Sequence, residues 1–324
     1  MKKPIWMLLA LSAVIAVSGC GNKSLTVQEP AKQQETATQP PAETKEDMLE
    51  RFKLLTTQAK EPGEVIRFLD ESMPKADQKQ ADGLFLELEK YYDRYLPSLN
   101  DNFLTMLSKP ETSQKMNEIG YPMDINNIKG DDTLKQWLLS QQAGGLALGN
   151  TEGMFYWKVD YKALQKYDKY LSNDLKSYIV LKAMESEKSY FEDGALVITR
   201  EELADRILKA EYYLTENPDG LKAKDVLELY KMYLNSYLTE YRYDAVDDTT
   251  LKLLPKVKKQ YQTFVSEHPE TKTAILVKKY LEVLNQNKDV IYEKGKDSIQ
   301  GPPIKDIQSF WDSLELKVNS LFTA

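Results

Sequence analysis

The sequence predicts an all-α fold assembled from helical hairpins, and three observations support this prediction. From residue 47 onward, apolar residues recur at helical spacing and strand-like alternation is rare. In the C-terminal half, two segments with the order helix, proline turn, helix follow one another, which is typical of helical repeats. The chain has 324 residues, of which 42% are hydrophobic, so it is long enough to bury a core of its own.

The N-terminus has the pattern of an export signal. Lys2 and Lys3 precede an apolar run over residues 5–17, which is too short to span a bilayer. The run ends at Val17-Ser18-Gly19-Cys20, which contains the only cysteine of the chain. This tetrapeptide resembles the lipobox of bacterial lipoproteins. The resemblance implies that residues 1–19 are a signal peptide and that Cys20 carries a diacylglyceryl anchor on the extracytoplasmic face of the cell membrane. An ordinary signal peptide followed by a stray cysteine is the alternative.

Composition narrows the classes of function. The chain contains one His and one Cys, and its formal net charge is −7. An acidic chain without a basic block is not expected to bind nucleic acid. Zinc sites need several His or Cys ligands, which this sequence lacks. We therefore expect no metal and no cofactor, and a lipidated Cys20 would leave no thiol for a disulfide.

Domain organisation follows from changes in composition along the chain. Residues 20–46 are rich in Gln, Thr, Pro, Glu and Ala, which predicts a disordered tether behind the lipidated cysteine. Residues 47–150 are predicted to form an N-terminal helical region. Residues 151–324 are predicted to form a C-terminal helical-hairpin repeat region.

Prolines and glycines mark the expected helix ends and turns of the N-terminal helical region. An amphipathic helix is expected to end at Pro97, because proline lacks the amide donor that the next turn needs. The following helix ends near Pro110. A loop over residues 120–130 then precedes a helix that includes residues 134–141. Gly144 and Gly145 come after it and indicate a turn or a close helix approach, because no phosphate-binding motif surrounds them.

Residues 151–161 form the only strongly non-helical apolar stretch, with Phe155, Tyr156 and Trp157 at its centre. Such a cluster can fill the joint between two helical layers, and this is the interpretation we favour. It can instead stack on a sugar ring or grip a peptide, so the three residues are also candidates for partner binding. Asp160 is expected to cap the helix that follows.

The C-terminal region repeats itself. The heptapeptides at residues 213–219 and 264–270 share an aromatic residue and a proline, and Pro218 and Pro269 are 51 residues apart. These units resemble the divergent tetratricopeptide repeats of bacterial envelope lipoproteins over about residues 199–291. The resemblance implies a tetratricopeptide-like array. An irregular helical array is the alternative, because the 51-residue offset exceeds the tetratricopeptide period of about 34.

Local signals mark the two ends of this repeat region. Thr199 and Glu202 form a capping box, and Ile198 and Leu203 flank it as a hydrophobic staple. At the other end, the pair Pro302-Pro303 introduces one last amphipathic helix.

Tyrosines recur at helical spacing in this region. Tyr230, Tyr233 and Tyr237 are expected to face the core. Tyr212 belongs to the same pattern. Tyr241 continues the line toward a helix end and is the leading candidate for contact with a partner, since tyrosine is a preferred anchor at binding surfaces.

Few residues fit catalysis. His268 stands in a Glu-His-Pro turn, which indicates an exposed turn residue. The segment from Asp124 to Asp132 has the wrong ligand spacing for a calcium loop and indicates a turn before an acidic helix start. Met184-Glu185-Ser186 and Gly194-Ala195-Leu196 resemble elements of lytic transglycosylases, which implies a general acid at Glu185. The alternative is a glutamate on a solvated helix face.

The function that these observations favour is non-enzymatic. We expect an envelope lipoprotein that binds or scaffolds a protein or cell-wall partner and is held on the membrane by the lipid on Cys20. The general pattern is similar to that of lipoproteins of Gram-positive bacteria. A peptidoglycan-cleaving enzyme that uses Glu185 is the alternative function.

Overall fold

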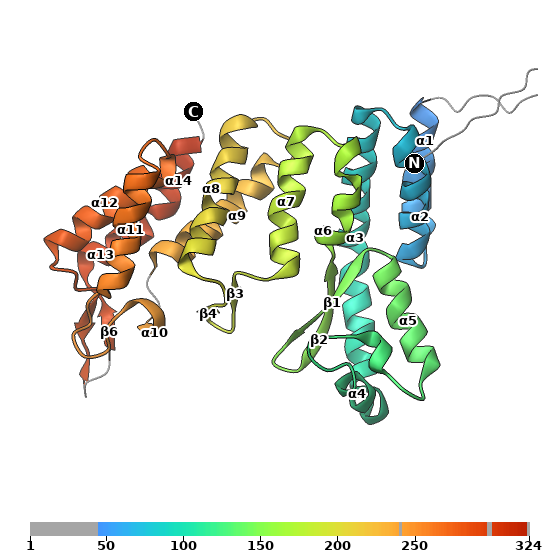
Figure 1. Cartoon of the computed structure of the whole chain (residues 1–324), viewed down its shortest axis with the longest axis horizontal. Helices are drawn as coiled ribbons and strands as arrows, with labels where there is room; N and C mark the ends of the chain where they lie inside the picture. The colour runs from blue at the N-terminus through green and yellow to red at the C-terminus, as the bar shows by residue number, and fades with distance from the viewer. Residues whose placement is uncertain (1–44, 240–241, 297–299, 323–324) are drawn as a thin grey trace, which may run out of the picture. The chain divides into compact units, whose positions relative to one another are not determined.

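The computed structural model describes residues 45–239, 242–296 and 300–322, which are mostly helical. This confirms the mainly helical class (Figure 1). The described residues belong to one compact unit. Cys20 and residues 20–44 of the expected tether lie outside the described residues. Within the described ranges, no helix is both long and apolar enough to cross a bilayer.

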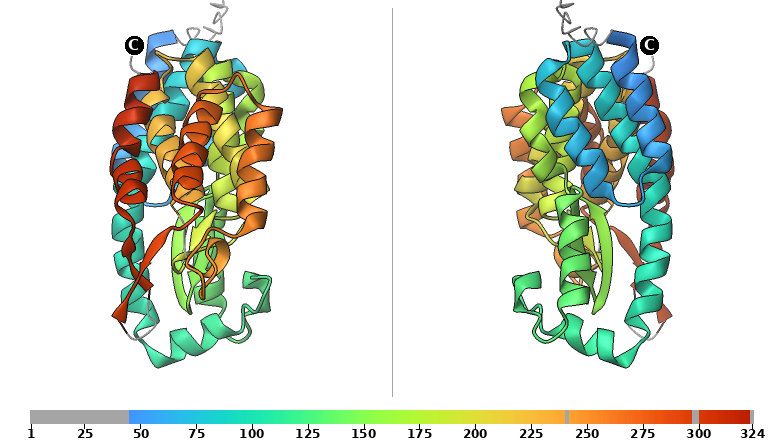
Figure 2. Two further views of the ribbon diagram at one scale, coloured as in Figure 1. Left: turned by 90° about the vertical axis from the view of Figure 1, so that its left-hand side faces the viewer. Right: turned by 90° about the vertical axis from the view of Figure 1, so that its right-hand side faces the viewer.

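The first half of the described chain combines helices with one β-hairpin. Its elements are α1 (Lys45–Gln58), α2 (Pro62–Ser72), α3 (Gln78–Leu107), α4 (Pro110–Asn117), α5 (Asp132–Ala143), β1 (Leu146–Thr151) and β2 (Met154–Val159). The short 3-10 helices Met73–Lys75 and Ile125–Asn127 connect some of them. α1 and β2 pack on α3, and α5 contacts both α2 and β1. Figure 2 shows the β1–β2 hairpin beside α3 and α5.

The expected helix end at Pro97 is wrong, because α3 continues through it to Leu107. Proline removes the hydrogen bond to the carbonyl of Asp93. Both residues are exposed, so water can bond that carbonyl. Beyond the proline, Leu99 and Phe103 are buried. Their burial on the same helix face favours continuation over a break.

The glycines after α5 are confirmed as a turn and a close approach. Gly144 caps α5, and a Cβ there would come within 2.3 Å of Pro62 Cγ at the start of α2. Gly145 has a φ of +74°, which favours glycine. The sequence did not predict strand β1 directly after this turn, where residues 146–151 pair antiparallel with β2. The expected domain boundary at 150/151 falls inside this strand.

The second half contains two helical hairpins and flanking elements. Its elements are α6 (Tyr161–Leu164), the 3-10 helix Gln165–Tyr170, α7 (Asn173–Glu187), β3 (Phe191–Glu192), β4 (Ala195–Leu196), α8 (Arg200–Glu216), α9 (Ala223–Leu238), α10 (Arg242–Ala245), α11 (Pro255–Glu267), α12 (Lys272–Gln286), β5 (Tyr292–Lys294), β6 (Gln300–Pro303), α13 (Lys305–Asp312) and α14 (Leu314–Phe322). The single last helix expected after Pro302-Pro303 is therefore two helices. The break at Ser313 lets α13 pack on α12 and α14 pack on α9.

Predicted helix starts are confirmed at the residue level. The side chain of Thr199 accepts a hydrogen bond from the amide of Glu202, and the Glu202 carboxylate accepts one from the Thr199 amide. Asp160 caps α6 by accepting from the amide of Ala163. Ile198 and Leu203, the expected staple, are both buried.

The two hairpins, α8 with α9 and α11 with α12, are stacked with their first helices parallel. Arg200 donates to the hydroxyl of Tyr261 at 2.9 Å near the start of α8. The carboxylate of Glu211 near its end accepts from the amide of Lys272 at 2.5 Å. Tyr261 lies in the middle of α11, and Lys272 begins α12 just after the turn that follows α11, so the end of α11 lies toward the end of α8 and the two helices run in the same direction. Neighbours in an up-down bundle would be antiparallel.

The regularly spaced tyrosines of α9 are buried, and two of them, Tyr230 and Tyr237, contact the second hairpin. Tyr230, Tyr233 and Tyr237 are almost fully buried, as expected from the sequence. Tyr230 shares a 2.8 Å hydrogen bond with the hydroxyl of Thr273, and the hydroxyl of Tyr261 donates to the carbonyl of Tyr237. Buried tyrosines need such partners because an unpaired hydroxyl is costly in a core.

A buried ionic cluster joins α3 to the first hairpin. Glu89, whose exposed fraction is only 5%, accepts hydrogen bonds from the hydroxyls of Tyr161 at 2.8 Å and Tyr178 at 2.7 Å. Its second oxygen lies 2.8 Å from the Nζ of Lys222, which precedes α9. Segments from both expected regions therefore share one polar cluster.

Candidate functional site

An apolar hollow of 560 Å³ opens along α8. It is lined by Ser177 and Val180 of α7, by Leu208, Lys209, Glu211, Tyr212 and Thr215 of α8, and by His268, Glu270 and Thr271 after α11. Tyr212 is 63% exposed, although it is a large aromatic residue. This solvent-facing tyrosine makes the hollow a candidate for binding another molecule.

A second hollow of 470 Å³ continues the first toward the start of α8. Its lining includes Ala204, Asp205 and Leu208 of α8 and Lys256, Lys259, Gln260 and Thr263 of α11. Leu208 and His268 line both hollows. We call the two together the α8 groove, which follows one face of α8.

The amphipathic pattern of α8 explains why this face is open. Leu203, Ile207 and Ala210 point into the core and are fully buried. A second apolar strip at four-residue steps, formed by Ala204, Leu208 and Tyr212, lies on the groove side. One core-facing stripe is enough to hold a helix, so this second strip is surplus to packing. The sequence carries this signal, but helical spacing alone groups Tyr212 with the core tyrosines.

Buried charged residues connect the helices that border the groove. Arg200 is buried, donates to the carbonyl of Tyr237 at 2.7 Å and lies over the ring of Tyr261. Glu211 accepts from the amides of Lys272 and Thr273, which lie in the first turn of α12 and have no carbonyl partner within that helix. These buried charges are held by structural contacts and fix the two walls.

His268 differs from its expected role. It follows the last residue of α11, is partly buried, and its ring lies 5.2 Å from the ring of Phe264. It therefore forms part of the wall shared by the two hollows, where an exposed turn residue was expected. The imidazole packs against the ring of Phe264, so it is less exposed than expected for a turn residue.

The aromatic stretch of β2 splits into different environments. Trp157 is 2% exposed and contacts the rings of Phe103 and Trp137, as the joint interpretation expected. The side chain of Asn100 bonds both the amide and the carbonyl of Trp157. This burial leaves Trp157 no open face for a partner.

Phe155 and Tyr156, the other two residues of the aromatic stretch, are partly buried. Phe155 packs against the core. Tyr156 lies opposite Gly149 across the hairpin, and a Cβ on Gly149 would approach its ring to 2.5 Å. Tyr241, the other candidate for partner contact, lies outside the described residues.

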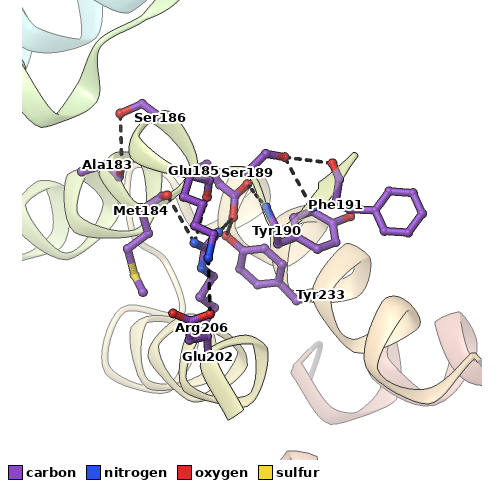
Figure 3. Close-up of polar contacts among 11 residues, drawn as sticks. Ala183, Met184, Glu185, Ser186, Ser189, Tyr190, Phe191, Glu202, Arg206 and Tyr233 are labelled. Atoms are coloured by element: carbon purple, nitrogen blue, oxygen red, sulfur yellow. Dashed lines mark hydrogen bonds and ion pairs between the residues drawn. The ribbon is translucent and has the colours of Figure 1, made fainter. Parts of the chain in front are cut away.

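Glu185 belongs to an ion-paired cluster between α7, α8 and α9 (Figure 3). One carboxylate oxygen accepts from the guanidinium of Arg206 and from the hydroxyl of Tyr233, at 2.6 Å from the latter. The other oxygen accepts from the amide of Tyr190 at 3.3 Å. Burial, and then the nearby Glu185 charge, raise the pKa of Tyr233, so its hydroxyl stays protonated and donates. These contacts account for Glu185 as a brace between helices.

The acidic loop before α5 is also accounted for. Asp124 accepts from the amide of Asn126, and Asp131 caps α5 by accepting from the amide of Leu134. This is the turn and acidic helix start that the sequence indicated. Across the described residues, no group of three or more His, Cys, Asp or Glu side chains is placed to hold a metal ion.

Known proteins offer no guide to the role of this groove. Comparison with models of protein families, with curated proteins and with solved structures finds no match to the chain.

Proposed function

We propose that this protein is a non-enzymatic binding module at the cell envelope, anchored through a lipid on Cys20, and that its partner is a protein. The α8 groove is the binding surface. The observation that carries the proposal is the second apolar strip of α8, in which Leu208 lines both largely apolar hollows and Tyr212, 63% exposed, lines the first. The lipobox resemblance supports the extracytoplasmic location.

We further propose that the hairpins form a tetratricopeptide-like array. Two features support it besides the parallel first helices. α8 and α11 end 51 residues apart, at Glu216 and Glu267, which is the offset of the two prolines. In each hairpin, a carboxylate also accepts a hydrogen bond from the backbone amide at the equivalent position after the turn. Asp174 accepts from the amide of Leu221 at 2.6 Å, and Glu211 accepts from the amide of Lys272, 51 residues later.

Such an array suits a binding role, because stacked hairpins present continuous surfaces to partners. The Glu185 alternative has no comparable support. Its carboxylate is engaged by three donors and does not line either hollow of the α8 groove.

A matched pair of tyrosine substitutions tests the binding role. The lipidated full chain, solubilised from membranes in detergent, is used to capture envelope proteins, and captured proteins are quantified by mass spectrometry. Tyr212→Ala should weaken capture of the specific partner by about 1–2 kcal/mol, which is about tenfold. Tyr121→Ala is the control, since Tyr121 is 99% exposed and lies far along the chain in the loop after α4. Equal capture by wild type and Tyr212→Ala would contradict the assignment of the groove.

A further inference from the structure

We propose that the α8 groove holds one amphipathic helix of the partner protein, and that this helix lies antiparallel to α11. The proposal rests on the binding role proposed above and specifies the form and direction of the ligand. Two observations lead to it, namely the spacing of the two hollows and the order of charges along α11.

The spacing of the hollows fits a helix better than a strand. The α8 residues that line the two hollows are centred about seven residues apart, which is about 11 Å along the helix axis. On a ligand helix, side chains seven residues apart point to the same side and are separated by about 10.5 Å. On a strand, same-face side chains lie about 6.7 or 13.4 Å apart, and neither distance matches. A helix with two large apolar anchors at positions i and i+7 therefore fits both hollows.

The charges of α11 oppose its own dipole. Its first turn contains no acidic residue and its last turn contains no basic one. The exposed Lys256 and Lys259 lie near its N-terminus, where the dipole is positive, and Glu267 and Glu270 lie at and beyond its C-terminus, where the dipole is negative. This order is unfavourable for an isolated α11. An antiparallel helix docked beside it would place its positive end at the glutamates and its negative end at the lysines.

The opposite wall offsets only part of this pattern. Asp205 of α8 forms an ion pair with Lys209. Glu201 keeps its charge, because the hydrogen bond that it accepts at 2.5 Å comes from the neutral side-chain amide of Gln260, but the two lysines of α11 outweigh this one carboxylate. The lysines and glutamates of α11 are thus the charges best placed to orient a ligand. Opposite charges placed in this way set direction and register at an interface.

Three fluorescein-labelled helical peptides of about 15 residues test the proposal by fluorescence anisotropy at low salt. The first has two phenylalanines seven residues apart, lysines in its first turn and glutamates in its last. The second exchanges the two charged turns. The third keeps the charges of the first but spaces the phenylalanines five residues apart, which turns them to different faces.

The peptides are measured against the full chain in detergent and against the fourfold variant Lys256→Glu, Lys259→Glu, Glu267→Lys and Glu270→Lys. Wild type should bind the first peptide at least about fivefold more tightly than the second, and the variant should invert the preference. The third peptide should bind at least about fivefold more weakly than the first. An inversion excludes peptide helicity as the cause, because both proteins meet the same peptides. Circular dichroism confirms that the variant is folded.

Equal affinities for the first two peptides, no inversion in the variant, or equal binding of the third would each overturn the proposal. Failure of all three peptides to bind would also overturn it. In these cases the Tyr212→Ala capture experiment remains decisive for the binding role. A loss of capture there would mean that the groove binds a ligand other than an antiparallel helix.

Discussion

The buried cluster around Glu89 gives the sharpest prediction about stability. Lys222→Met removes the cation that pairs with Glu89 and leaves its carboxylate buried with two tyrosine hydroxyls as donors. Breaking one side of a buried ion pair typically costs about 3–5 kcal/mol. Because the two hydroxyls still solvate the carboxylate, we expect a loss near the lower limit, about 3 kcal/mol.

Urea unfolding followed by circular dichroism measures this loss. The control is Lys162→Met, since Lys162 pairs with Glu187 on the surface and should change stability by at most about 0.5 kcal/mol. The double variant Glu89→Gln with Lys222→Met should lose about 2 kcal/mol less stability than the two single variants lose together. If Lys222→Met costs no more than Lys162→Met, the reasoning about this cluster is refuted.

The cluster around Glu89 also makes the stability of the fold depend on pH. Burial alone would lower the pKa of Lys222, but the carboxylates of Glu89 and Asp225 outweigh it and raise the pKa above 10.5. Burial also raises the pKa values of Tyr161 and Tyr178, and the charge of Glu89 adds to the rise in both. A group whose pKa is raised on folding stabilises the protein below its unfolded pKa and loses that effect as pH rises through the folded value. The free energy of unfolding should therefore be insensitive to these groups at neutral pH and should decrease above pH about 10.

Three further changes have defined outcomes. Pro97→Ala should raise the free energy of unfolding by about 1–2 kcal/mol in urea, because the exposed proline interrupts α3 without packing, and a loss would show that it has a structural use. Glu185→Gln should lower thermal stability while peptidoglycan release stays at background in wild type and variant; release present only in wild type would establish the enzyme. Cys20→Ser should abolish fatty-acid labelling in cells, and label retained on the serine variant would refute lipidation there.

Features fixed by neighbouring residues could be predicted from the sequence. The capping box at Thr199 and the cap at Asp160 depend only on contacts within one turn, so the local pattern was sufficient. The core positions of Tyr230 and Tyr233 followed from helical spacing within a single helix.

Features fixed by distant residues could not be predicted in this way. The helix through Pro97 depends on the burial of Leu99 and Phe103 against other elements. Strand β1 contains Leu146 and Leu148, which have no strong strand preference, and it is held by pairing with β2. The pairing of Glu185 with Arg206 joins separate helices. For the α8 groove, the strip of Ala204, Leu208 and Tyr212 was visible, but only the fold shows that nothing in the described chain covers it.

Photo-cross-linking from the α8 groove tests the proposed binding surface most directly. A benzophenone amino acid replaces Leu208, which lines both hollows, and in a matched protein it replaces Met232, which is 52% exposed on α9. Both full-length lipidated proteins are irradiated in cells. We expect one discrete cross-linked partner from position 208 and none of that species from position 232. A cross-link pattern that is the same from both positions would contradict the groove as the site of binding.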